Sequence, residues 1–371
     1  MKTIVLSSTL HDPQGRLLDD LPQALEVVLQ FYEGWVVSYT PITNRSIKRL
    51  LANHRNVYVN PIKKTDLHAK EQIEYNHLRA LDIAREIAVD CNIPLIQYTD
   101  ADRIIMAANR FPRSFAALRD KLKKYSASNK FYMSLRRSAD DFLTHHLPLV
   151  QTEKVFNEVY SEVFGMPIDI GSTAHIMSVD VVERILHDSH NLPAVSFPHP
   201  KWLIIAAMMN AHIHSEQIDH MLSFETPEQY KEDVVKELNH VQLHKLTEKE
   251  TKVVTKDETL KIKGRAVSPI TSDDLDDDYF LLQQAYESTI GRFANVSQRE
   301  WRLRYHTQHQ YLSLLLHSLP ALGLGSDERM FSAKVEKAIE HSKKQKEQIL
   351  HILRRKASKV EVSIKETLQL S

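Results

Sequence analysis

Two aspartates one residue apart, Asp100 and Asp102, are the residues of this 371-residue chain whose spacing most clearly suggests chemistry. They follow an apolar run over residues 93–97, which we interpret as a buried strand, and precede a helical pattern over residues 104–122. Mg²⁺ and Mn²⁺ prefer oxygen ligands, commonly one or two carboxylates together with substrate phosphates. A strand end is also where open α/β sheets bind ligands. The alternative is a solvated pair that caps the following helix.

Glycine is scarce, with 8 residues scattered along the chain. Neither a Walker loop nor a dinucleotide-binding fingerprint can be assembled from them. If the protein binds a nucleoside diphosphate, a divalent metal must therefore neutralise the phosphates, which again favours Asp100 and Asp102 as its ligands.

Composition excludes several other classes. The 48 basic and 48 acidic residues cancel, so no global field favours nucleic acid or an anionic membrane. The single cysteine, Cys91, excludes a disulfide framework and fits a reducing compartment. We expect no signal peptide, and the longest apolar run, residues 202–211, is too short to span a bilayer. We therefore expect a cytoplasmic protein that does not bind nucleic acid.

Strands and helices alternate along the first hundred residues. The patterns predict strands over residues 3–8, 35–40, 57–59 and 93–97, and helices over residues 18–32, 46–54 and 74–88. Such alternation predicts an α/β fold with a doubly wound, mainly parallel sheet whose functional groups lie at the carboxyl ends of the strands. A further strand over residues 131–135 is followed by Arg136 and Arg137, and helices follow over residues 155–164 and 178–186.

The composition changes near residue 230. We expect residues 1–230 to form the α/β domain, residues 231–278 a charged connector or hairpin, and residues 279–371 a helical C-terminal region. The C-terminal helices offer a surface for a homo-oligomer. A basic segment over residues 343–359 could lie on an anionic membrane, but its short apolar face favours packing against protein.

The order of these features resembles that of glycosyltransferases with the GT-A fold, and more distantly the mannosylglycerate synthase-like members. The resemblance covers roughly residues 1–230. It includes the first strand and its nucleotide-binding loop, the Asp-Ala-Asp motif at residues 100–102, and a glycine-containing acceptor loop at residues 168–173. The class commonly carries an Arg-Asn pair on the helix before the motif. Asn76 is present here, but Tyr75 replaces the arginine.

The resemblance implies a metal-dependent enzyme that moves a sugar from a nucleotide-diphosphate donor to a small-molecule or glycan acceptor. The metal, Mn²⁺ or Mg²⁺, would be held by Asp100, Asp102 and His214. The donor would contact Ser7, Ser8, Thr9, Asn76 and Asp100. Arg136, Arg137, Gly171 and Ser172 would bind the acceptor, an anionic one if the arginines hold it. Asp169 would deprotonate the acceptor hydroxyl. Each residue also has an ordinary structural alternative: strand end, turn aspartate or packed histidine.

One departure from the family pattern concerns catalysis. Inverting members usually carry an acidic pair after the acceptor loop, whereas residues 199–202 here are His-Pro-Lys-Trp. The stereochemistry therefore stays open, and so does a non-catalytic binding or scaffold protein. A nucleotidyltransferase is the third alternative. That class normally opens with a glycine-rich basic loop, and residues 7–14 have neither the glycines nor a lysine.

Overall fold

The computed structural model describes residues 4–12, 15–62, 69–125, 129–143, 145, 147–223, 260–262, 265–267 and 294–369. The chain divides into two compact units. The sheet unit comprises Met1–His145, Val150–Phe224 and Thr307–His341, and the second unit comprises His146–Leu149, Glu225–His306 and Ser342–Ser371. The predicted boundaries at residues 230 and 278 stay predictions, since most of the connector lies outside the described residues.

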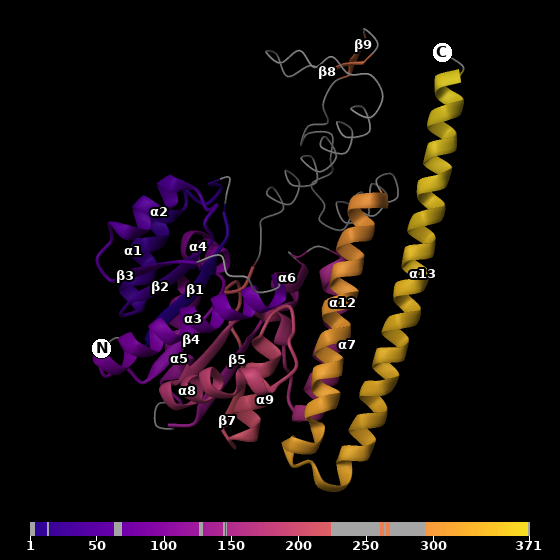
Figure 1. The fold of residues 1–371 in the computed structure, drawn as a ribbon. Coiled ribbons are helices and arrows are strands. Elements are labelled where there is room, and N and C mark those ends of the chain that lie inside the picture. The colour runs from indigo at the N-terminus through magenta and orange to yellow at the C-terminus, as the bar shows by residue number, and fades with distance from the viewer. Residues whose placement is uncertain are drawn as a thin grey trace. The chain divides into compact units, whose positions relative to one another are not determined.

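A seven-stranded sheet forms the centre of the sheet unit, in the order β3-β2-β1-β4-β6-β5-β7 (Figure 1). Its strands are β1 Ile4–Leu10, β2 Trp35–Tyr39, β3 Val57–Pro61, β4 Leu95–Tyr98, β5 Phe131–Arg136, β6 His175–Ser178 and β7 His212–Gln217. Strand β1 pairs in parallel with β2 and β4, β2 with β3, and β5 with β7. Only β6 is antiparallel to its two neighbours, β4 and β5. The predicted α/β fold with a mainly parallel, doubly wound sheet is confirmed.

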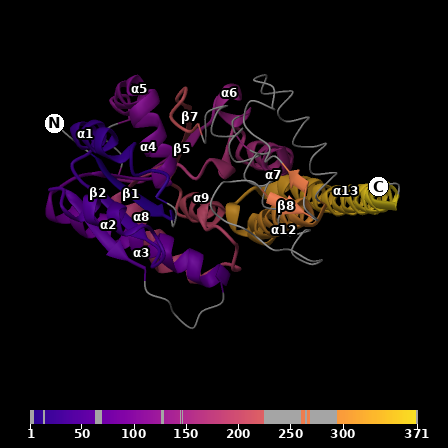
Figure 2. The same cartoon turned by 90° about the horizontal axis from the view of Figure 1, so that it is seen from above.

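Helices cover both faces of this sheet, so its inner strands β1, β2, β4, β6 and β5 are mostly buried, as is usual for parallel sheets, whereas the edge strands β3 and β7 are partly exposed. In Figure 2, helices α1 (Leu21–Phe31), α4 (Ala101–Arg110) and α5 (Arg113–Leu122) lie on one side of β1 and β2, and α3 (Ala69–Asp90) lies on the other. Strand β1 shows the alternation directly, since Ile4 and Leu6 join the core under α1 and Val5 joins the core under α3.

The remaining helices follow the same layering. Apolar residues of α2 (Arg45–Ala52) join the core on the α1 side. Those of α7 (Leu147–Phe164), α8 (Val179–Asp188) and α9 (His199–Met208) join the core on the α3 side. The C-terminal helices are α12 (Ala294–Ser318) and α13 (Glu328–Gln369). Tyr311, Leu315 and Val335 from these two helices pack into the α3-side core, which confirms the predicted helical appendage.

The second unit contains a two-stranded antiparallel sheet, β8 (Leu260–Ile262) with β9 (Arg265–Val267), and the short helix α6 (Ala139–Leu143) belongs to the sheet unit. Among the described residues, no helix combines the length and apolarity that crossing a bilayer requires.

Three local predictions need correction. The helix expected over residues 104–122 is two helices, α4 and α5. They separate at Phe111 and Pro112, because proline has no N–H to continue the helical hydrogen bonds. Helix α7 begins at Leu147 rather than at residue 155. Strands β6 and β7, of 4 and 6 residues, were not predicted, since histidines and polar residues interrupt their apolar pattern.

Helix α9 occupies most of the longest apolar run, and nearly all of it is buried because the helix is apolar on every side. Its one lysine, Lys201, is 1% exposed and donates to Glu74 Oε1 of α3 at 2.6 Å and to the carbonyl of Ser189 at 3.0 Å. This buried ion pair links α9 to α3.

We expect Lys201→Met to lower the free energy of unfolding by about 3–5 kcal/mol, because it leaves the Glu74 carboxylate buried without its ammonium partner. Lys334→Met is the matched control, since Lys334 and Glu162 form an exposed pair that contributes about 0–1 kcal/mol. Urea unfolding of both variants gives the comparison. Equal small losses would contradict a stabilising role of the buried Lys201–Glu74 pair.

Candidate functional site

The Asp100–Asp102 pair lies at the carboxyl end of β4, as predicted. Asp100 occupies the N-cap position of α4 and Asp102 lies in the first turn of that helix. Strand β4 adjoins β1, and the strand order reverses direction between them. In open α/β sheets the crevice outside such a switch point is where ligands bind. The position of the pair is therefore the usual ligand-binding position of this architecture.

The hydrogen bonds of Asp100 do not support the alternative of a helix-capping pair. Its side chain makes no capping bond to α4. Its Oδ2 accepts from the Thr173 hydroxyl at 2.8 Å, and its Oδ1 lies 3.5 Å from the Tyr98 hydroxyl. Tyr98 also shares a 2.9 Å hydrogen bond with Thr9 of β1. Asp100 is thus held by side chains from outside its own helix.

The two carboxylates repel each other in a desolvated setting. Burial and the charge of Asp100 raise the pKa of Asp102 to about 6, although Arg103 partly opposes the shift. The Arg103 guanidinium donates to the carbonyl of Ser172 at 2.6 Å, while its backbone N–H donates to Asp102. A divalent cation would relieve this repulsion, so the donor set fits the predicted Mg²⁺ or Mn²⁺.

His214 does not belong to this donor set. It lies on β7, which β6 and β5 separate from β4 by three strand spacings of about 4.8 Å each, or about 14 Å. Its ring packs 4.4 Å from Tyr125 and 5.4 Å from Phe131, measured between ring centroids. The prediction of His214 as a metal ligand is therefore wrong. Within the described part of the chain, no group of three His, Cys, Asp or Glu side chains could hold a metal.

Arg137 and Asp169 form an ion pair with each other instead of facing an acceptor. The side chain of Arg137 is fully buried. Its Nε donates to Asp169 Oδ2 at 2.7 Å, and its NH2 nitrogen donates to Asp169 Oδ1 at 2.6 Å and to Glu153 at 2.5 Å. Asn157 donates to the same Oδ1 at 2.8 Å. Despite burial, Arg137 holds the pKa of Asp169 below its usual value.

This network corrects two predicted roles. A general base must have a free oxygen within reach of the proton it takes. Both oxygens of Asp169 are occupied by Arg137 and Asn157, so the predicted base role does not fit this structure. Arg137 is occupied as well, and its predicted role in binding an acceptor fails for the same reason. Arg136, the last residue of β5, is partly exposed and keeps that prediction.

The acceptor loop is also more closed than predicted. A Cβ at Gly171 would collide with the Glu153 carboxylate, so glycine serves close packing against Glu153 rather than approach to a sugar. Ser172, in the 3-10 helix η1 (Ile170–Ser172), is buried, and its hydroxyl accepts from the backbone N–H of Ala174. Both residues are buried, so neither the Gly171 backbone nor the Ser172 side chain is open to an acceptor, contrary to prediction.

The predicted donor contacts have mixed outcomes. Ser7 and Ser8 are fully buried, and the Ser8 hydroxyl accepts from the Trp35 indole at 3.0 Å. Both serines lie inside β1, which runs on to Leu10, so the predicted end of this strand at residue 8 is wrong and Ser8 packs within the sheet. Thr9 is partly exposed and reaches the Asp100 neighbourhood through Tyr98. Asn76 accepts from Gln72 on its own helix at 2.9 Å, and its predicted donor role stays a prediction.

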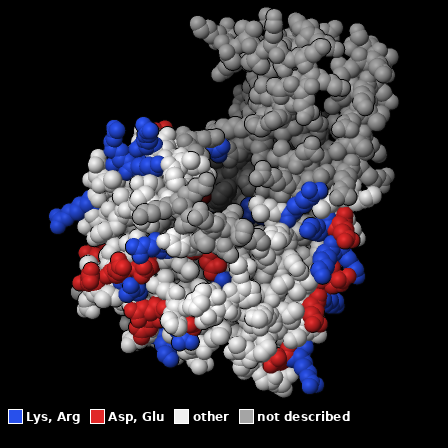
Figure 3. Space-filling model, viewed as in Figure 1, with Lys and Arg blue, Asp and Glu red and all other residues white. Residues whose placement is uncertain are grey.

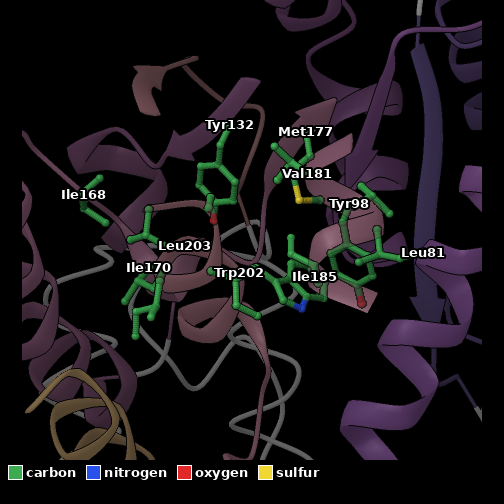
Figure 4. Close-up of a cluster of buried hydrophobic side chains, with 14 of the residues drawn as sticks. Leu81, Tyr98, Tyr132, Ile168, Ile170, Met177, Val181, Ile185, Trp202 and Leu203 are labelled. Carbon is green, nitrogen blue, oxygen red and sulfur yellow. The ribbon is translucent and has the colours of Figure 1, made fainter. Parts of the chain in front are cut away.

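Three buried histidines were not expected beside the site. His77, His175 and His199 pack with Tyr98 and Trp202, and the ring centroid of His199 lies 5.2 Å from that of His175 and 5.3 Å from that of His77. Figure 4 shows Tyr98, Tyr132 and Trp202 of the same cluster, with β4, β5 and α9 as their sources. The Tyr132 hydroxyl shares a 2.9 Å hydrogen bond with His175 Nδ1.

The histidines of this cluster are held uncharged by burial. Burial lowers the pKa of His77 to about 4 and that of His175 to about 3, and it lowers the pKa of His199 well below its usual value. Neither ring nitrogen of His199 has a hydrogen-bond partner among the described residues. The spacing of these histidines in the sequence does not indicate that they form a cluster, because only the packing of α3, β6 and α9 brings them together.

Comparison with known proteins finds no matching family model and no matching curated protein. Among solved structures, it finds Mycobacterium tuberculosis glucosyl-3-phosphoglycerate synthase in complex with Mn²⁺, uridine-diphosphate-glucose and phosphoglyceric acid. The two chains are 11% identical, the match covers 59% of this chain and 70% of that chain, and the TM-score is 0.38. It also finds S. aureus TarS 1–349, with 10% identity, 93% and 92% coverage, and a TM-score of 0.35. Superpositions this loose assign no role to any residue of the site.

We expect Asp102→Asn to stabilise the metal-free protein by about 1–2 kcal/mol at pH 7. The substitution removes a carboxylate charge that Asp100 repels and that the protein shields from water only in part. Thermal unfolding in EDTA measures the change. Asp180→Asn is the control, because Asp180 is an exposed first-turn aspartate of α8 and should change stability by less than about 0.5 kcal/mol. A loss of stability in Asp102→Asn would contradict the repulsion.

We expect stability to fall as the pH falls from about 6.5 toward 4. The unfolded chain binds protons at the ordinary histidine pKa, whereas the folded cluster excludes them, so the stabilisation is complete above pH 6.5 and is lost below it. The loss should be about 1–2 kcal/mol per buried histidine between pH 6.5 and 5.

Urea unfolding at several pH values measures this dependence. His77→Phe should reduce the slope, and the exposed control His341→Phe should not. A slope that neither substitution changes would show that other groups cause the acid sensitivity.

Proposed function

We propose that this protein is a glycosyltransferase that moves a sugar from a nucleoside-diphosphate donor in a divalent-metal-dependent reaction. The observation that carries the proposal is the repelled pair Asp100–Asp102 at the switch point of a mainly parallel sheet. The GT-A resemblance of residues 1–230 supports the same function. Asp100 and Asp102 would hold Mn²⁺ or Mg²⁺, and bound metal would stabilise charge on the leaving diphosphate.

The chain's own residues supply binding and orientation around this pair. The hydroxyls of Thr173 and Tyr98 contact the Asp100 carboxylate. Thr9, near the carboxyl end of β1, shares a hydrogen bond with Tyr98. The first turn of α4 points its backbone N–H groups toward the same sheet edge, which favours an anionic ligand. Together these groups form the donor side of the proposed site.

The acceptor side of the proposed site lies toward the end of β5. With Arg137 buried, Arg136 stays the candidate for an anionic small-molecule or glycan acceptor. Lysine and arginine side chains also gather over α2 in Figure 3, and Arg45 and Arg49 of that helix are exposed.

We keep a cytoplasmic location as a proposal, which the exposed free Cys91 supports. Assembly through the C-terminal helices is likewise a proposal.

A second candidate is a protein that binds the donor without transferring its sugar. Two observations favour it: Asp169 is occupied by Arg137, and residues 199–202 contain no carboxylate. A retaining reaction is the alternative explanation of the same observations, since it needs no base at the acceptor loop. Nucleotidyl transfer lacks a supporting observation.

We expect nucleoside diphosphate binding to depend on the metal. Titration calorimetry of UDP and GDP with Mn²⁺ should show binding of at least one, weakened at least about tenfold in EDTA or in Asp102→Asn. Equal affinity with and without Mn²⁺ would refute the proposed role of the pair. Release of sugar from the bound nucleotide sugar then separates a transferase from a binding protein.

A further inference from the structure

Thr173 has a backbone conformation that is unusual for its residue type. Its φ of 57° and ψ of 21° lie in the left-handed region, where it ends the 3-10 helix η1. A β-branched residue is a genuine outlier there, and such conformations cost about 1–3 kcal/mol. Glycine or asparagine would adopt this conformation at lower cost. A strained residue that persists beside a candidate site indicates a use for its side chain.

Among the described residues, the hydroxyl of Thr173 makes one specific hydrogen bond. It donates to Asp100 Oδ2 at 2.8 Å, across 73 residues of sequence. With this backbone conformation, the side chain reaches Asp100 at the start of α4. Thr173 is only partly buried, so solvent could satisfy its hydroxyl without this contact.

The surrounding loop is held independently of this contact. Arg103 donates to the carbonyl of Ser172 at 2.6 Å, and Arg137 binds Asp169 through both carboxylate oxygens. The backbone N–H of Leu135 donates to the carbonyl of Ala174 at 2.9 Å. Because residues on both sides of Thr173 are fixed, its hydroxyl adds little to the position of the loop and determines mainly the position of the Asp100 carboxylate.

We infer that Thr173 is a positioning residue that orients Asp100 for a divalent cation. This inference rests on the proposed function. Thr173 binds Oδ2, and the contact of Oδ1 with Tyr98 is long, at 3.5 Å. Oδ1 of Asp100 is therefore the oxygen available to a cation. By binding Oδ2, the Thr173 hydroxyl keeps Oδ1 turned toward that cation. Partners that orient ligating carboxylates typically change metal affinity by about 10–100-fold when removed.

The test measures Mn²⁺ affinity and thermal stability in three variants of the full chain. Thr173→Val keeps the β-branched shape and removes the hydroxyl. Thr173→Gly removes the hydroxyl and relieves the backbone, and Thr173→Ser keeps the hydroxyl. We expect Thr173→Val and Thr173→Gly to weaken Mn²⁺ binding by about 10–100-fold, and Thr173→Ser to stay within about threefold of wild type. Electron paramagnetic resonance of unbound Mn²⁺ measures the affinity without any turnover.

The stability readout separates positioning from a merely structural role. We expect the melting temperature of Thr173→Gly to equal or exceed that of wild type, while its Mn²⁺ affinity falls. A variant that melts earlier and binds Mn²⁺ like wild type would overturn the inference. If Thr173→Val does not fold, Thr173→Gly decides alone, since glycine adopts the left-handed region freely.

The two hypotheses fail in distinguishable ways. Wild-type protein that binds no Mn²⁺ would overturn the proposed function and the role of Thr173 with it. Wild-type binding that neither Thr173→Val nor Thr173→Gly weakens would overturn the role of Thr173 alone and leave the proposed function standing.

Discussion

The buried ion pair between Arg137 and Asp169 is the constraint on which the candidate site depends. A fully buried guanidinium is tolerated only when carboxylates surround it, and Asp169 and Glu153 supply them. Satisfying that charge fixes residues 168–173 against the end of β5. Once the loop is fixed there, Thr173 meets Asp100 and the carbonyl of Ser172 meets Arg103. A charge requirement inside the core thus sets the geometry of a surface site.

Desolvation near the Asp pair lowers the pKa values of histidines and raises that of an aspartate, and in both cases it favours the uncharged form. On the α3 side it keeps three histidines uncharged and packed against Tyr98. At the sheet edge it raises the pKa of Asp102 beside a second carboxylate. Groups with strongly shifted pKa values cluster at functional sites, because binding requires arrangements that stability alone does not favour. The strained backbone of Thr173 belongs to the same pattern.

Adjacent arginines illustrate a limit of sequence interpretation. Arg136 and Arg137 were equivalent candidates for acceptor binding. Arg136 is the last residue of β5 and stays partly exposed, whereas Arg137, directly after the strand, is buried against Asp169 and Glu153. Which one is buried depends on where Asp169 and Glu153 lie. That information belongs to α7 and the loop after it, not to the strand that carries the arginines.

The sequence by itself determined the α/β architecture and the position of the Asp pair, because both follow from local patterns: alternating strands and helices, and polar residues directly after an apolar strand. Only the tertiary structure decided the partners of that pair. Strand β6, of 4 residues, inserts antiparallel between β4 and β5 and joins segments 40–80 residues apart. This long-range pairing brings Thr173 to Asp100 and Asp169 to Arg137, the packing of α9 brings His199 to His175, and the strand order separates His214 from the Asp pair. Local patterns do not encode such pairings, since their stability comes from contacts that form only when the whole sheet has assembled.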